Sequence, residues 1–150
     1  MQIITLGSDR EVLLRRKARK VGRMTQDIRG LVDQMVGFVQ GTEGVLGLAA
    51  PQVGYSYRIL VAKADGRLVT LVDPVVISMS EETSVADESC LSLPGVLVPV
   101  KRALRISVLG RNRKGIGVTT HATGLLARVL QHELDHLDGI LITDPARNGA

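Results

Sequence analysis

Residues 123–139 read TGLLARVLQHELDHLDG, and this stretch decides how the rest of the chain is interpreted. Its apolar residues recur at steps of three and four, and Gly139 is a typical stop, so we expect one helix from about Thr123 to Asp138. Spacings of four, three and four place one set of side chains on a single face of that helix: Leu125, Val129, His132 and His136.

The same stretch contains the pattern H-E-x-x-H. His132 and His136 are four residues apart, so both imidazoles can bind one metal ion. Glu133 then lies within reach of a metal-bound water, where it can shuttle a proton. The alternative is a pair of structural histidines, because a buried imidazole is tolerated once its hydrogen bonds are satisfied. A catalytic site also needs a third ligand and an oxyanion stabiliser.

Cys90 supplies the missing ligand type. As the single cysteine it forms no internal disulfide, and a lone cysteine is usually an inert small hydrophobe. Together with His132 and His136, however, it makes a set of three protein ligands with a fourth position open, which is the catalytic pattern. His121 could close the site as a fourth ligand, but nothing places it on the helix face.

The composition is that of an ordinary globular protein. Of the 150 residues, 45% are hydrophobic and 23% charged, which favours one domain with an aliphatic core. The chain contains no run of eighteen apolar residues, so we predict no membrane span. Its first residues lack the layout of a secretory signal. We expect a cytoplasmic protein, or an organellar one whose transit peptide has been removed.

The net charge of +4 comes largely from two basic segments, residues 15–20 and 111–114. The chain has only three aromatic residues for base stacking and no recognised nucleic-acid motif. We therefore predict solvated basic faces and no DNA partner. A surface that faces the ribosome is the alternative.

The remaining elements are predicted from local patterns. Ser8 and Glu11 have the form of a capping box, which predicts a helix that runs through the first basic segment. A second helix is expected over residues 25–40, with Gly41 as its stop. Expected strands cover residues 58–63, 68–72, 75–79, 104–109 and 115–120, with a hairpin turn at Asp65-Gly66. The glycine-rich residues 44–54 suggest a tight connection, and residues 144–150 a frayed tail.

This order of elements predicts an α+β fold. Strands occupy the centre of the chain without regular alternation with helices, so antiparallel or mixed sheets are expected. They would surround a central C-terminal helix that carries H-E-x-x-H, with further helices at the N-terminus.

Three segments resemble the signature motifs of the peptide deformylase family, in the same order and spacing. The family patterns are G-φ-G-φ-A-A-P-Q, E-G-C-L-S and Q-H-E-φ-D-H, and the matching segments here are residues 46–52, 88–92 and 131–136. The resemblance covers nearly the whole chain, so we expect residues 1–150 to form a single catalytic domain.

The resemblance implies a metal-dependent hydrolase that removes the formyl group from the N-terminal formyl-methionine of nascent polypeptides and releases formate. It implies that Cys90, His132 and His136 hold the metal, with ferrous iron foremost and zinc, nickel or cobalt as alternatives. A metal-bound water would be the nucleophile, and Glu133 would act as general base and then general acid.

The resemblance also implies further roles around the metal. The side-chain amide of Gln52 and the backbone N–H of Leu91 would stabilise the oxyanion. The backbone of Leu46 and Gly47 would pair with the substrate as an added strand. The methionine side chain would rest on apolar residues of the last helix, of which Leu125 and Val129 face the same way as the histidines. Binding partners would be N-formylmethionyl peptides, and no membrane is expected.

The chain departs from the family pattern in three places. Val45 stands in register with the first glycine of the first motif, and Ser89 stands at the glycine of E-G-C-L-S. The sequence also stops soon after Asp144, which resembles compact members without a long C-terminal helix. We expect Ser89 to tune the site mildly.

Two other functions are considered. A zincin-like metalloprotease also uses H-E-x-x-H, but here the third ligand would be the upstream Cys90, and no histidine or glutamate follows His136. A weak or inactive metal-binding homologue would be favoured by loss of Glu133 or Gln52, and both residues are present.

Overall fold

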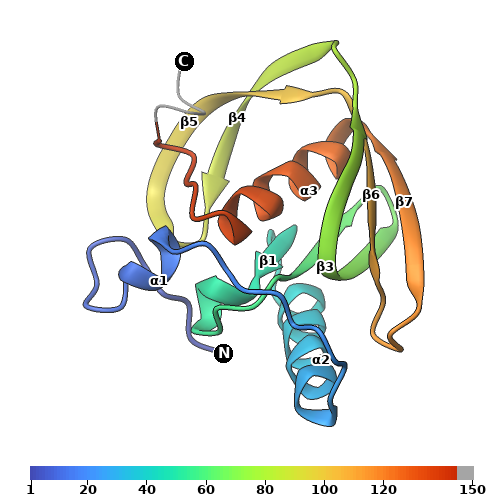
Figure 1. The fold of residues 1–150 in the computed structure, drawn as a ribbon. Helices are drawn as coiled ribbons and strands as arrows, with labels where there is room; N and C mark the ends of the chain where they lie inside the picture. Colours follow the sequence, from blue (N-terminus) through green and yellow to red (C-terminus); the bar gives the residue numbers. More distant parts are fainter. Residues whose placement is uncertain (145–150) are drawn as a thin grey trace.

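The computed structural model describes residues 1–144 and has helices packed against antiparallel sheets (Figure 1). The elements in chain order are α1 (Val12–Arg15), α2 (Gln26–Gly41), β1 (Gly47–Ala49), the 3₁₀ helix η1 (Ala50–Val53), β2 (Ile59–Ala64), β3 (Arg67–Met79), β4 (Thr83–Cys90), β5 (Leu93–Ala103), β6 (Arg105–Arg111), β7 (Gly117–Thr123) and α3 (Gly124–Leu137). One sheet has the order β1-β2-β3-β6-β7, and β4 and β5 form a second sheet. The α+β prediction is confirmed, and the ladders between these strands are all antiparallel.

Strand β2 lies between two helices, and this explains its unbroken apolar run from Ile59 to Ala62. Side chains alternate along a strand, so Leu60 and Ala62 join the core under α3, whereas Ile59 and Val61 join the core under α2. Figure 1 shows α3 in the middle of the molecule, with β4 and β5 on one side and β3, β6 and β7 on the other. Burial of each large aliphatic side chain contributes about 1.5–3 kcal/mol, so α3 is held firmly in place.

The predictions with the strongest local signals are confirmed. Helix α2 begins as expected, because the Thr25 hydroxyl accepts a hydrogen bond from the Ile28 N–H at 3.2 Å. Asp65 and Gly66 have φ values of 53° and 76°, as a two-residue hairpin turn between β2 and β3 requires. Helix α3 lies within the predicted range.

Other predictions in the sheets are wrong or incomplete. The hairpin of β4 and β5 was not predicted, although it forms an entire sheet. The separate strand expected from Val75 is the second half of a single long β3. That strand continues through Pro74 with an irregular register beside Asp73, whose φ is 52°. Residues 44–54 contain β1 and η1 rather than only a connection.

The N-terminal helix prediction is also wrong. Helix α1 spans only Val12–Arg15, and no capping box forms, because the Glu11 carboxylate accepts from the Gly7 N–H at 3.0 Å. The basic residues 16–23 form no helix. Of the predicted frayed tail, residues 145–150 lie outside the described part of the chain. No helix within residues 1–144 has the length and apolar character to cross a membrane.

Candidate active site

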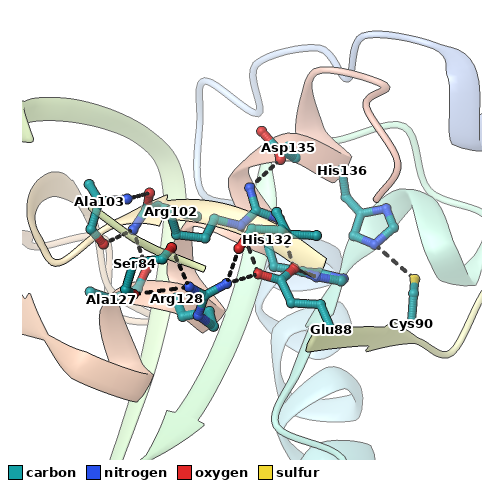
Figure 2. Close-up of polar contacts among 12 residues, drawn as sticks. Ser84, Glu88, Cys90, Arg102, Ala103, Ala127, Arg128, His132, Asp135 and His136 are labelled. Carbon is teal, nitrogen blue, oxygen red and sulfur yellow. Dashed lines mark hydrogen bonds and ion pairs between the residues drawn. The ribbon is translucent and has the colours of Figure 1, made fainter. Parts of the chain in front are cut away.

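A cavity of about 540 Å³ lies between β1, the end of β4 and helix α3. The predicted site residues that line it are Leu46, Gly47, Gln52, Cys90, Leu91, Leu125, Val129, His132 and Glu133. His136 is the one predicted site residue that does not line the cavity. It is buried, and its Nε2 lies 3.3 Å from the Cys90 sulfur (Figure 2). The structure therefore brings together residues from segments up to ninety residues apart in the sequence.

Three of these side chains form a compact donor set. The ligand atoms of Cys90, His132 and His136 all lie within 4.8 Å of one another, and no other such group occurs in residues 1–144. The two histidines lie one turn apart on α3, as their spacing predicts, with ring centroids 5.0 Å apart, and Cys90 comes from the end of β4 in the β4–β5 hairpin. His121 does not join them, because its Nδ1 lies 2.7 Å from the Ser107 hydroxyl on the exposed face of β7.

The orientation of His132 is fixed by a carboxylate. Its Nδ1 lies 2.9 Å from Oε1 of Glu88, which accepts hydrogen bonds when ionised. The tautomer that donates from Nδ1 leaves the Nε2 lone pair free to bind a metal, as in many carboxylate–histidine–metal arrangements.

The charges around the donor set favour a cation. Burial lowers the pKa of His132, but hydrogen bonds to Cys90 and Glu88 have the larger effect and raise that pKa to about 10. The surroundings of the His132 ring therefore favour positive charge. Burial holds the pKa of His136 well below its ordinary value, and the nearby charges of His132 and Arg102 act in the same direction. A neutral imidazole is the form that binds a metal.

Glu88 is the centre of a buried ion-pair network, drawn in Figure 2. Arg102 donates to both of its oxygens, at 2.8 and 2.9 Å, and Arg128 donates to Oε2 at 2.7 Å. Arg102 also bonds Asp135, one residue before His136. Burial raises the pKa of the Glu88 carboxyl, but the hydrogen bonds from Arg102 and His132 outweigh it and hold the pKa well below its usual range. Glu88 therefore stays ionised and keeps His132 oriented.

This network was largely missed from the sequence. Asp135 bonds Arg102, which donates to the Glu88 carboxylate beside His132. Arg102 lies on β5, which was not predicted, and no local pattern marks it as a partner of a residue fourteen positions earlier.

Gln52 is positioned by three contacts. Its side-chain oxygen accepts from the Ala49 N–H at 3.0 Å, and its nitrogen lies 3.2 Å from the Ser92 hydroxyl and 3.7 Å from the Cys90 sulfur. These bonds fix the amide so that its N–H₂ group faces the donor set. The first residues of the chain support the arrangement, because the Ile4 N–H donates to the Gln52 carbonyl.

Glu133 is buried beside the cavity. Burial raises its pKa to about 7, and its Oε2 has no hydrogen-bond partner among residues 1–144. A Cβ at Gly47 would lie 2.8 Å from Oε1 of Glu133 and 3.0 Å from Cγ1 of Val129. Only glycine at position 47 leaves the carboxylate room in its observed place.

The family is decided by comparison with known proteins. The sequence profile described as polypeptide deformylase matches residues 1–150. The chain belongs to the polypeptide deformylase family. This membership confirms the resemblance seen in the three motifs and removes the zincin-like protease as an interpretation.

Individual members of the polypeptide deformylase family are also similar to this chain in sequence and in structure. The peptide deformylase of Dictyoglomus thermophilum is 46% identical over 134 residues, which cover 89% of this chain and 86% of the relative. The crystal structure of the peptide deformylase from Thermotoga maritima superposes with a TM-score of 0.89 at 35% identity, covering 99% of this chain and 97% of that one. The enzyme of Vibrio parahaemolyticus bacteriophage VP16T, solved with actinonin, gives a TM-score of 0.84 at 32% identity over 95% and 100% of the chains.

The two departures from the deformylase motifs can now be located. Val45 is buried among the apolar side chains under α2, and the preceding Gly44 has a φ of 80°, a conformation that glycine adopts readily. Ser89 is exposed and lines the cavity beside Cys90. The structure describes no hydrogen bond of the Ser89 side chain to the donor set.

Proposed function

We propose that residues 1–150 act as a single catalytic domain that removes the formyl group from N-terminal formyl-methionine of nascent polypeptides. The observation that carries the proposal is the meeting of the donor set with Glu133 in one cavity, in a chain that matches the family over its whole length. An inactive homologue has no support from the site, since Glu133 and Gln52 both lie at the cavity.

Cys90, His132 and His136 would hold one divalent metal ion. One sulfur and two nitrogen donors, with His136 neutral, suit ferrous iron first and zinc, nickel or cobalt as alternatives. When bound, the metal supplies Lewis-acid polarisation of the formyl carbonyl and activates water for attack.

Glu133 would move the proton. A general base is most effective when its pKa is close to the working pH, and burial raises the pKa of Glu133 to about 7. Its carboxylate takes a proton from the attacking water as the new C–O bond forms. It then gives that proton to the amide nitrogen as the C–N bond breaks, and formate and the free amine leave.

Gln52 and Leu91 would stabilise the oxygen that becomes negative during attack. The Gln52 amide is held rigidly toward the donor set, and Leu91 follows Cys90 at the cavity wall. Donors fixed in advance stabilise developing charge more than mobile ones, because no reorganisation is needed.

The substrate backbone would lie along β1. Within residues 1–144 this strand pairs with β2 on one edge only, and Leu46 and Gly47 line the cavity, so the other edge is available for an added strand. The methionine side chain would pack on Leu125 and Val129 of α3. Because the phage relative was solved with actinonin, we also propose that this cavity binds actinonin.

The proposal is tested by release of free amine from formyl-Met-Ala-Ser by the ferrous or nickel protein. Acetyl-Met-Ala-Ser and the Cys90→Ala variant are the controls, and both should release little amine because one lacks the small formyl group and the other lacks a ligand. Absence of release by the wild-type protein, with a relative active in the same assay, would contradict the proposal.

Gly47→Ala is expected to lower kcat by about 10- to 100-fold, because the added methyl displaces the Glu133 carboxylate from its place by the cavity. Metal content should be unchanged, since Gly47 contacts no ligand of the donor set in the contacts described. Gly37→Ala in α2 is the matched control, because a Cβ there meets nothing within 4 Å. Equal kcat for the two variants would show that the close approach at position 47 has no catalytic importance.

A further inference from the structure

Arg128 is the one arginine or lysine that lines the cavity within residues 1–144. It lies on α3 between Leu125 and Val129, the two residues on which the methionine side chain would pack under the proposed function. Its side chain is only 12% exposed, so it belongs to the wall of the cavity and not to a solvated rim. The proposed reaction steps do not use it.

The guanidinium of Arg128 is occupied by the β4–β5 hairpin. One terminal nitrogen donates to Oε2 of Glu88 at 2.7 Å and to the Val100 carbonyl at 2.9 Å. The other donates to the carbonyl and the hydroxyl of Ser84, at 2.9 and 3.2 Å (Figure 2). The two terminal nitrogens carry four N–H groups, and these bonds use all four. No terminal N–H group is left for a substrate carboxylate, so Arg128 contributes its aliphatic stem to the cavity.

The hairpin depends on bonds to α3, because β4 and β5 pair only with each other in the part of the chain that the structure describes. Toward the C-terminal end of α3, Asp135 bonds Arg102. One turn earlier, the Gln131 amide bonds the Ala103 backbone. Arg128 comes three residues earlier still and makes the bonds nearest to the apolar side chains proposed to hold methionine. It therefore fixes the distance between α3 and the hairpin at that place.

We infer that Arg128 determines which first side chain of a formylated peptide the cavity accepts. The inference rests on the proposed function, which places the methionine side chain on Leu125 and Val129. Four bonds to three residues on two strands hold the hairpin wall at a set distance, and the Arg128 stem fills the space between. A wall fixed in this way selects by size, because a bulkier side chain has to break those bonds or move the hairpin.

The test compares the kcat/KM for formyl-Phe-Ala-Ser with that for formyl-Met-Ala-Ser on the same ferrous or nickel sample. Arg128→Ala removes the stem and all four bonds, and should raise this Phe-to-Met ratio by about tenfold or more. Arg128→Lys keeps a cation beside Glu88 but cannot make the same four bonds, so it should raise the ratio by a smaller factor. The ratio does not depend on how much of a sample is folded or holds metal, because both peptides meet the same active molecules.

Arg58→Ala is the matched control. The Arg58 side chain is also mostly buried, at 14% exposed, and it donates to the Ala18 and Leu137 carbonyls and to Asp138. It bonds the opposite end of α3 and does not line the cavity. Its replacement should lower stability as that of Arg128 does, and should leave the Phe-to-Met ratio at the wild-type value.

An unchanged ratio in both Arg128 variants, or an equal rise in Arg58→Ala, would overturn the inference. A wild-type protein that hydrolyses neither peptide would instead contradict the proposed function. In that case the dissociation constants of the two peptides, measured by calorimetry on the nickel protein, decide the inference. Their ratio should change in Arg128→Ala and not in Arg58→Ala. An unchanged binding ratio, or no binding of either peptide by the wild type, would overturn the inference as well.

Discussion

Replacing Glu133 by glutamine is expected to lower kcat by about 10²- to 10⁴-fold while the protein keeps its metal. The amide fills the same space beside Gly47 but accepts no proton from water, and the three ligands of the donor set are untouched. The measurement is amine release from formyl-Met-Ala-Ser, with metal content determined on the same sample.

The unfolding temperature of Glu133→Gln shows whether the variant is still folded. Burial raises the pKa of Glu133 from 4.5 to about 7, so ionisation of this carboxyl opposes folding progressively as the pH rises through that window. Glu133→Gln removes the ionisation and should unfold at a temperature no lower than the wild type above pH 7. Full activity in a variant that still binds metal would refute the role assigned to Glu133.

Arg102→Leu is expected to lower the free energy of unfolding by about 3–5 kcal/mol. The substitution leaves Glu88 and Asp135 buried without the guanidinium that bonds both carboxylates. Because Glu88 orients His132, we also expect metal affinity to fall by about 10- to 100-fold. Urea unfolding and metal titration measure the two effects.

Arg105→Leu is the matched control for Arg102. Arg105 pairs with Glu82, but both side chains are exposed, at 54% and 69%, so the pair is screened by water. Its removal should change the free energy of unfolding by less than about 1 kcal/mol. Comparable losses in the free energy of unfolding of the two variants would show that burial does not determine how much the Arg102 ion pairs contribute to stability.

The parts of the fold that could be predicted are those specified by neighbours in the sequence. Helix α2 carries its own cap at Thr25, and the turn between β2 and β3 needs the left-handed conformations that Asp65 and Gly66 adopt. Helix α3 shows its buried face in the spacing of its apolar residues. These signals do not depend on the rest of the chain.

The parts that could not be predicted depend on distant contacts. Strands β4 and β5 bury Glu88 and Arg102 at positions where a half-buried strand would show apolar residues, so their alternation is hidden. Residues 16–23 resemble a helix in sequence, but Asp73 and the end of α3 hold their backbone in another conformation.

The candidate site, like the fold, could be predicted in part. Cys90, His132 and His136 were found because the chemistry of a metal restricts ligand types and spacing. Arg102 and Arg128 escaped notice because their bonds to Glu88 exist only once β4, β5 and α3 have assembled.

A metal held by Cys90, His132 and His136 should be required for deformylation. The most direct measurement follows metal content and formate release together, on anaerobically purified protein that is stripped with a chelator and then titrated with ferrous iron or nickel. We expect activity to vanish on stripping and to return in proportion to metal, with full activity at one ion per chain and none in Cys90→Ala. Formate release that persists in the stripped protein would contradict the account.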